Sequence, residues 1–304
     1  MVGSIDEQRE WAQTSVLALT EEDRCVLEVT GGDRLSWLNG LLTCQLVGRK
    51  DGEAVYGLAV AQKGKIVSDV IVLLAGERAL LVVQRRTVDT LVASFEHHLM
   101  MEDAEFRRLE DDVWSAHGPK AQLLLDAAKS AAGAGGALDM TGAGGTVLVM
   151  PRGDAGREAL TQAAAAAGGG RGDLAGWDAV RVPAGVPRFG VDFDDTTYPK
   201  EAGLEKRAVS FEKGCYLGQE VVCMLEMRGH VKRKLVSLRV PGTHVLAPHV
   251  SVKDDKGATI GEVTSGVQLS HSAEPEVRGL AMIKYAFIAP GTVVSVEGKP
   301  ATVL

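Results

Sequence analysis

The segment Lys213–Glu220, Lys-Gly-Cys-Tyr-Leu-Gly-Gln-Glu, holds the residues of this chain that are best suited to chemistry. Cys215 lies between two glycines, which permit positive φ and a close approach of the backbone to a ligand. Lys213 precedes it by two residues, and the run Gln219–Met227 has the apolar spacing of a short helix. A cation and a helix N-terminus both favour a thiolate. The pattern therefore predicts a thiolate at Cys215 that attacks an electrophile, binds a soft metal or exchanges with another sulfur.

The other three cysteines have a structural interpretation. Cys25 and Cys44 lie within apolar patterns typical of a core, and Cys223 falls on the expected helix. The cysteines lack C-x-x-C spacing, so we expect no self-contained metal site, and reduced thiols are typical of a cytoplasmic protein. A buried, unreactive thiol is the alternative for Cys215 itself.

The charge is unevenly distributed along the chain. The net charge is −7, yet residues 201–240 hold eight basic and five acidic residues, a balance of +3 that leaves −10 for the rest. An acidic protein with one basic segment is a poor general nucleic-acid binder but suits a small anionic ligand. A solvated charged face is the alternative interpretation.

Nothing in the hydropathy indicates a membrane or an export route. The longest apolar stretches, such as Val70–Ala75, are far shorter than a membrane span. Residues 1–13 carry three acidic side chains and no apolar run, so we do not expect a secretory signal. The predicted location is the cytoplasm.

The elements that must position these residues have an α+β order. Apolar alternation and turn residues predict strands and helices in the first hundred residues, with strands at 15–19, 25–30, 54–61, 65–74 and 79–84 and helices at 34–42 and 86–98. Asp33 is the expected N-cap of the first helix. We therefore expect an N-terminal α+β subdomain over 1–120, joined by part of 175–230.

Two further domains are expected. Residues 121–230 contain Ala- and Gly-rich segments, including a predicted helix at 155–167, and read as a second α+β subdomain that ends with the Cys215 segment. Residues 231–304 contain short, evenly spaced strand patterns with Pro-Gly and Lys-Gly turns, which predict a small antiparallel β-barrel.

The Cys215 segment resembles the K-G-C-Y-x-G-Q-E motif of the YgfZ family of folate-binding proteins that support iron–sulfur cluster maturation. The segments Arg181–Arg188, Pro199–Glu201, Gly32–Gly40 and Lys63–Asp69 resemble other motifs of that family. The resemblance covers essentially the whole chain. It implies the fold of the glycine-cleavage T-protein, an aminomethyltransferase, with three subdomains in a cloverleaf around a central channel and a C-terminal barrel.

Two departures from the T-protein pattern weaken a transferase interpretation. The T-protein has a pair of adjacent acidic residues where this chain has Ser68 and Asp69, so one of the two acids is missing. Pro183 stands where the T-protein has a glutamate that contacts the pterin. Proline offers neither a carboxylate nor a backbone donor.

The resemblance implies a tetrahydrofolate cofactor and assigns residues to it. Asp69 and Gln84 are the expected partners of the pterin, and a solvated acid at a strand edge is the alternative for Asp69. The cations expected to bind the anionic glutamate tail are Arg188, Arg228 and Lys213. Tyr216 is the aromatic ring expected to stack on the cofactor. Gln219 and Glu220 are expected to fix the loop. A role for Gln219 and Glu220 at the start of a helix is compatible with this.

Three functions remain open from the sequence. In the leading hypothesis Cys215, activated by Lys213, supports assembly or repair of iron–sulfur clusters in client or scaffold proteins. One cysteine supplies only one ligand of a transient cluster shared with a partner, and the chain is then not a conventional enzyme. The competing hypothesis is a tetrahydrofolate-dependent aminomethyltransferase or demethylase that needs Asp69 and not Cys215. The third is a folate-binding regulator without chemistry.

Overall fold

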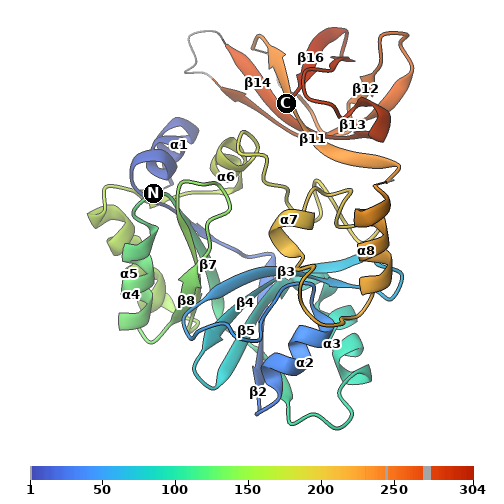
Figure 1. Ribbon diagram of the computed structural model, residues 1–304. Helices are drawn as coiled ribbons and strands as arrows, with labels where there is room; N and C mark the ends of the chain where they lie inside the picture. The colour runs from blue at the N-terminus through green and yellow to red at the C-terminus, as the bar shows by residue number, and fades with distance from the viewer. Residues whose placement is uncertain (1, 230, 244–245, 270–274) are drawn as a thin grey trace. The chain divides into compact units, whose positions relative to one another are not determined.

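The computed structural model describes residues 2–229, 231–243, 246–269 and 275–304 (Figure 1). The chain forms two compact units. The first comprises Met1–Trp177 and Arg207–Gln219, and the second comprises Asp178–Lys206 and Glu220–Leu304. The division into three domains at residues 120 and 230, and the channel between them, stay predictions. No helix among the described residues has the length and apolar character to cross a membrane.

One antiparallel sheet of the first unit carries the predicted Asp69. Its strand order is β3-β4-β5-β2-β6. The strands are β2 (Arg24–Thr30), β3 (Ala54–Val60), β4 (Ile66–Ala75), β5 (Arg78–Gln84) and β6 (Glu105–Leu109). Because side chains alternate between the faces of a strand, Val70 and Val72 pack in the core with helices α2 (Arg34–Leu41) and α3 (Val88–His97), and Asp69 takes the opposite face.

The other sheet of the first unit has the order β10-β1-β7-β9-β8. Its strands are β1 (Leu17–Thr20), β7 (Asp112–His117), β8 (Ala134–Ala137), β9 (Gly145–Met150) and β10 (Gly170–Arg171). Helices α4 (Ala121–Ser130) and α5 (Asp154–Ala166) share its core with the fully buried Trp114. A bridge between Glu53 and Ala137 joins the two sheets.

Two local features differ from the sequence expectations. Helix α1 (Ile5–Thr14) was not expected, although the side chain of Ser4 accepts from Glu7 N–H and the Glu7 carboxylate accepts from Ser4 N–H, which is a capping box. Asp33 lies at the N-cap position of α2 but makes no side-chain capping bond. Its carboxylate instead accepts the N–H of Asp103 at 2.9 Å, so it joins two loops.

The second unit contains a closed, six-stranded antiparallel barrel, which confirms the prediction for the C-terminal region (Figure 1). Its strands are β11 (Arg233–Pro241), β12 (Ser251–Lys253), β13 (Thr259–Leu269), β14 (Glu276–Lys284), β15 (Val293–Val296) and β16 (Lys299–Val303). Strand β16 was not predicted; it contains Pro300, a residue that is found on edge strands and rarely within a sheet. Its pairing with β15 and β11 closes the barrel.

Short helices complete the chain. They are α6 (Leu174–Arg181), α7 (Glu205–Ala208), α8 (Gln219–Arg228) and the 3₁₀ turns η1 (Arg85–Thr87) and η2 (Tyr285–Phe287). Together with the sheets they confirm the α+β class.

A buried guanidinium anchors the barrel to the loop segment of its own unit. Arg181 Nη1 donates to Asp192 Oδ2 at 2.7 Å and to the carbonyl of Val186, and Nη2 donates to Ser265 Oγ at 2.8 Å. The Arg181 and Asp192 side chains are 1% and 0% exposed. Removing one partner of such a pair leaves an uncompensated charge in a low-dielectric interior.

We therefore expect Arg181→Met to lower the free energy of unfolding by about 3–5 kcal/mol. Arg278→Met, which removes a more exposed pair with Glu276 in the same unit, should cost less than about 1 kcal/mol. Urea denaturation of both variants checks this, and equal losses would contradict the assignment.

Candidate functional site

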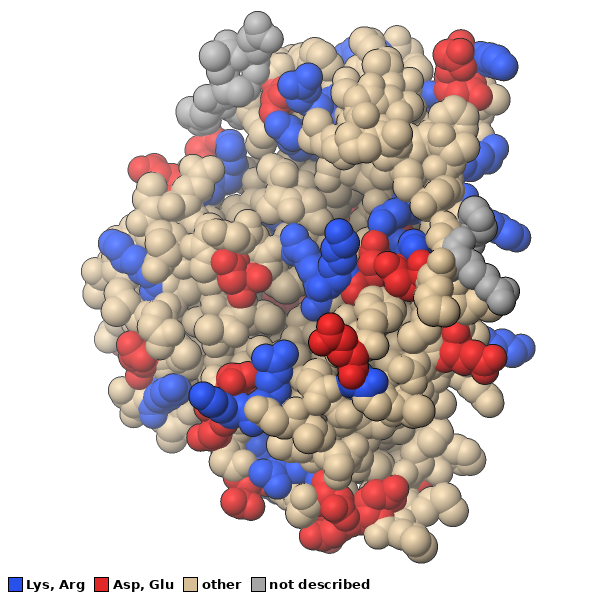
Figure 2. Space-filling view, in the orientation of Figure 1, with Lys and Arg blue, Asp and Glu red and all other residues tan. Residues whose placement is uncertain are grey.

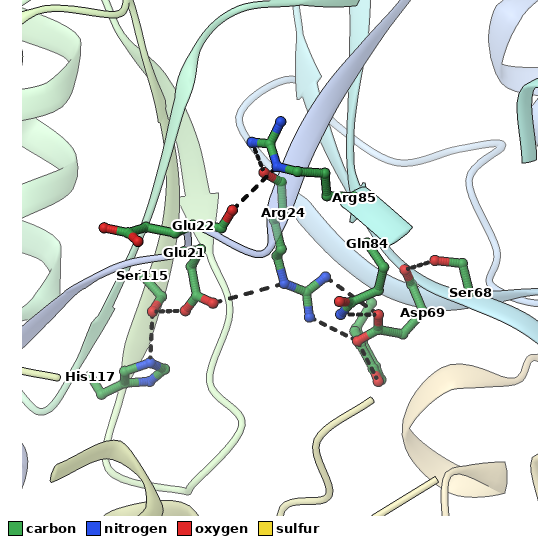
Figure 3. A network of polar contacts seen from close by, with 10 residues as sticks. Glu21, Glu22, Arg24, Ser68, Asp69, Gln84, Arg85, Ser115 and His117 are labelled. Carbon is green, nitrogen blue, oxygen red and sulfur yellow. Dashed lines mark hydrogen bonds and ion pairs between the residues drawn. The ribbon is translucent and has the colours of Figure 1, made fainter. Parts of the chain in front are cut away.

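The carboxylate of Asp69 is the centre of a buried polar cluster on the sheet face opposite α2 and α3 (Figure 3). Arg24 Nη2 donates to Oδ2 at 2.8 Å and Nη1 to Oδ1 at 3.4 Å, while Gln84 Nε2 donates to Oδ1 at 2.9 Å. Tyr56 OH completes the set with a 3.4 Å contact to Oδ2. Asp69 and Gln84 are each 3% exposed, so the solvated strand-edge alternative for Asp69 is wrong.

These contacts set the charge state of the cluster. Although burial lowers the pKa of Arg24, the charges of Asp69 and Glu21 outweigh it and raise that pKa above its ordinary value. Burial, together with the negative charge of Asp69, raises the pKa of Tyr56 well above 10. The cluster therefore holds an ionised guanidinium and a neutral phenol beside the carboxylate.

The cluster extends into the neighbouring sheet (Figure 3). Glu21 Oε2 lies 3.9 Å from Arg24 Nε, and Ser115 Oγ donates to Glu21 Oε1 at 2.5 Å. His117 Nε2 lies 3.1 Å from the same hydroxyl. Because the single hydroxyl proton goes to Glu21, His117 Nε2 must be the donor in this contact.

His117 is a neutral histidine. Burial lowers its pKa to about 3, and its ring stacks on Trp177 with centroids 3.8 Å apart. Among the described residues, nothing hydrogen-bonds its Nδ1. A ring with so low a pKa is a poor base at neutral pH, so His117 orients Ser115 and Glu21.

A hollow of about 410 Å³ opens beside Tyr56, and we call it the Tyr56 hollow. Its lining includes Arg49, Tyr56, Asp139, Met140, Thr141 and Arg207. The volume falls within the range of small-molecule sites. Tyr56 thus lines the hollow and also reaches Asp69 through its hydroxyl.

The structure leaves Cys215 exposed, whereas Cys25 and Cys44 are buried and Cys223 is half-buried. Of the two flanking glycines, only Gly218 has a positive φ, 75°. A Cβ at Gly218 would lie 2.4 Å from the Ala61 carbonyl oxygen, so this position requires glycine. Gly214 has no atom within 4 Å of such a Cβ and needs no special conformation.

Lys213 has partners that the sequence did not predict. Its Nζ donates to the carbonyls of Asn39 at 2.5 Å, Leu42 at 2.6 Å and Cys44 at 2.8 Å, and it lies 4.9 Å from the centre of the Tyr216 ring. Burial lowers its pKa to about 8. All three of its donors are committed to backbone carbonyls, so its activation of Cys215 stays a prediction without a contact in its support.

The other predicted cofactor residues are divided between the two units. Tyr216 is buried within the first unit. Arg188 belongs to the second unit, where its N–H donates to Asp192. Gln219 and the exposed Glu220 are the first two residues of α8, as the helix-start interpretation expects. Arg228 ends that helix, and its side chain lies outside the described residues.

Sequence reasoning missed five members of the cluster. These members come from β2, β3, β7 and the loop before β2, and the sequence around each is that of an ordinary strand or turn: Arg24, Tyr56, Ser115, His117 and Glu21. A partial signal was present: Arg24, Asp69 and Gln84 are polar residues at strand positions that alternate with apolar core residues.

The comparisons with known proteins agree with this architecture. Residues 11–138 match the family described as GCVT N-terminal domain. The chain is 30% identical to an aminomethyltransferase of Frankia alni over 90% of this chain and 80% of that protein. It is 28% identical to an aminomethyltransferase of a Nostoc species, over 90% and 79% of the two chains.

A solved structure gives the same result for the fold. The crystal structure of the glycine cleavage system aminomethyltransferase T from Bartonella henselae superposes with a TM-score of 0.85 at 20% identity, covering 99% of this chain and 88% of that one. The chain belongs to the aminomethyltransferase family and has its α+β fold.

His117 predicts a pH dependence of stability. The pKa of His117 is about 3 in the folded chain and has its ordinary value of 6.5 in the unfolded chain. Between these two pH values the unfolded chain therefore binds a proton that the folded chain does not bind. Its stabilising contribution is complete above pH 6.5 and is lost as the pH falls toward 3, with a slope of up to about 1.4 kcal/mol per pH unit.

We expect His117→Phe, which keeps a ring on Trp177, to remove this slope between pH 6.5 and 5. Chemical denaturation across that window measures it, with the exposed His97→Phe as control. A slope that persists in His117→Phe would show that another group is responsible.

Proposed function

We propose that this chain binds a tetrahydrofolate-type cofactor at the Asp69 cluster and acts in folate-dependent one-carbon transfer. The observation that carries the proposal is the buried carboxylate of Asp69, paired with the Gln84 amide next to a ligand-sized hollow. Relatives named aminomethyltransferase over most of the chain support it.

The donors around Asp69 suggest how a pterin is held. A carboxylate has about four acceptor positions, and four donors occupy them here. Two of these contacts, from Arg24 Nη1 and Tyr56 OH, are 3.4 Å long and weak. N–H groups of a pterin replace these two weak contacts at the lowest cost, while the 2.8 Å and 2.9 Å bonds keep the carboxylate oriented.

The same geometry defines what Asp69 does for the reaction. Bound tetrahydrofolate supplies the nitrogen that accepts the one-carbon group. Arg24 and Gln84 hold the carboxylate of Asp69 in place, so Asp69 orients the cofactor and stabilises positive charge that develops on it. Burial of the cluster strengthens that effect because it excludes water.

Asp69→Asn should weaken tetrahydrofolate binding about 10- to 100-fold, because a charged hydrogen bond is lost. It should also abolish tetrahydrofolate-dependent turnover of a methylated amine or aminomethyl donor. Gln84→Leu, which keeps the ion pair, should weaken binding less. Calorimetry and a turnover assay measure both effects.

Glu28→Gln is the matched control. Like Asp69, Glu28 is a buried carboxylate in an ion pair, and its partners are Arg78 and Arg107. It should lower thermal stability without changing cofactor affinity. Wild-type affinity in Gln84→Leu and Asp69→Asn would exclude the proposed site.

The exposed thiol favours a second candidate function, the support of iron–sulfur clusters that the YgfZ resemblance implies. Cys215 is the exposed member among four free cysteines, and it sits in the segment that carries the resemblance. No group of three or more metal-ligating side chains occurs among the described residues. A cluster ligated by Cys215 would therefore be shared with a client or scaffold protein.

The two candidate functions differ in whether they require Cys215. If the second candidate holds, Cys215→Ala should fail to restore iron–sulfur enzyme activity in cells that lack the protein, while Cys223→Ala should restore it. Tetrahydrofolate affinity should be unchanged in both. Full restoration by Cys215→Ala would reject the thiol function and leave one-carbon transfer.

A further inference from the structure

A second hollow, of about 300 Å³, lies within the second unit, and we call it the Glu205 hollow. The barrel strands β11 and β14 line it together with residues 202–206 of the loop segment and α7. Leu235 N–H donates to the Glu201 carbonyl at 2.7 Å and so ties β11 to that segment. The walls of the hollow are therefore held by the fold itself.

Glu205 supplies a buried carboxylate to this hollow. The residue is 8% exposed, and Lys234 Nζ donates to its Oε1 at 2.7 Å. The other oxygen, Oε2, is buried and accepts no hydrogen bond from the described residues. An ionised carboxylate can only accept hydrogen bonds, and a buried acceptor without a donor is costly. Oε2 is therefore the acceptor at which a donor group of a ligand is expected.

The other polar groups of the lining complete its charge pattern. Lys206 is exposed and makes no hydrogen bond or ion pair with the described residues, so its ammonium remains available. Ser237 adds a hydroxyl and lies opposite Leu280 in the pairing of β11 with β14. The hollow thus offers a carboxylate oxygen and an ammonium to the same ligand, beside apolar groups of Leu235 and Leu280.

This pattern selects among ligand classes. A metal cation would face the charges of Lys206 and Lys234, and phosphate would face the charge of Glu205, so like charges disfavour both. A zwitterion presents an ammonium to Glu205 and a carboxylate to Lys206, and ionised pairs are stronger than neutral hydrogen bonds. The volume is at the lower end of the range for small-molecule sites, which favours a short apolar side chain.

We propose that the Glu205 hollow binds a free α-amino acid with a small apolar side chain. The ammonium of the amino acid donates to Glu205 Oε2, and its carboxylate pairs with Lys206. The residues of this site belong to the second unit, whereas Asp69 belongs to the first. The site is therefore additional to the proposed cofactor site and does not depend on it.

The test titrates glycine, L-alanine and L-valine into the full-length protein and follows binding by NMR. Two analogues of valine each lack one charged group. Isovalerate lacks the ammonium and should bind about 10- to 100-fold more weakly than L-valine, because a buried charged hydrogen bond is lost. Isobutylamine lacks the carboxylate and should bind about two- to fivefold more weakly, because the pair with Lys206 is exposed. The proposal is overturned if none of the three amino acids binds, or if either analogue binds as tightly as L-valine.

Two variants locate the binding. Glu205→Gln keeps an oxygen for Lys234 but removes the charge, and it should weaken L-valine binding about 10- to 100-fold. Lys206→Gln should weaken it about two- to fivefold. Because Lys206 is exposed, this second variant should fold normally even if Glu205→Gln does not. Wild-type affinity in Lys206→Gln, or in a folded Glu205→Gln, overturns the proposal.

Each variant has a matched control in the second unit. Glu201 is a buried carboxylate of the same segment that lies 3.8 Å from Arg233 of β11 and does not line the hollow. Lys253 of β12 is an exposed lysine outside the hollow. Glu201→Gln and Lys253→Gln should both keep the wild-type affinity for L-valine. Losses in these controls equal to those in Glu205→Gln and Lys206→Gln would contradict a site at the hollow.

Discussion

The ion pair between Arg24 and Asp69 is the interaction on which the candidate site depends. Taking two charges out of water costs several kcal/mol each, and the cost is offset here because further groups satisfy the remaining hydrogen-bonding positions. Gln84 and Tyr56 donate the remaining hydrogen bonds to the Asp69 carboxylate, and Glu21 lies beside the Arg24 guanidinium. The chain through Ser115 to the neutral His117 then links the two sheets of the first unit.

Much of the fold could be predicted from the sequence because it follows local patterns. Alternating apolar residues placed most strands, and the turn residues of the last seventy positions indicated the barrel. The cluster around Asp69 could be predicted only in part. Arg24 meets Gln84 through the register of β2 against β5, and β4 pairs with β5 so that Val70 lies opposite Val83. Such a register depends on contacts between distant segments and on which face is buried.

The Lys213 and Cys215 pair illustrates what the order of neighbours in the sequence does not predict. One residue, Gly214, separates them, which suggested a cation beside a thiol. In the folded chain the ammonium turns inward to the carbonyls of residues 39, 42 and 44 and leaves the thiol exposed. An unpaired backbone carbonyl is costly when buried, so this lysine stabilises a loop. On the face drawn in Figure 2, basic and acidic side chains lie in small groups of both signs.

The pairing of β1 with β10 has a consequence for synthesis of the chain. Leu17 lies beside Gly170 in a parallel pair, and the segment Arg207–Gln219 returns to the same unit. Translation proceeds from the N-terminus, so the first strand must wait for more than half of the polypeptide before its edge is filled. Topologies with such distant partners fold slowly. The edge of β1 that β10 fills therefore stays unpaired during synthesis until residues 170–171 have left the ribosome, and an unpaired strand edge is prone to aggregate.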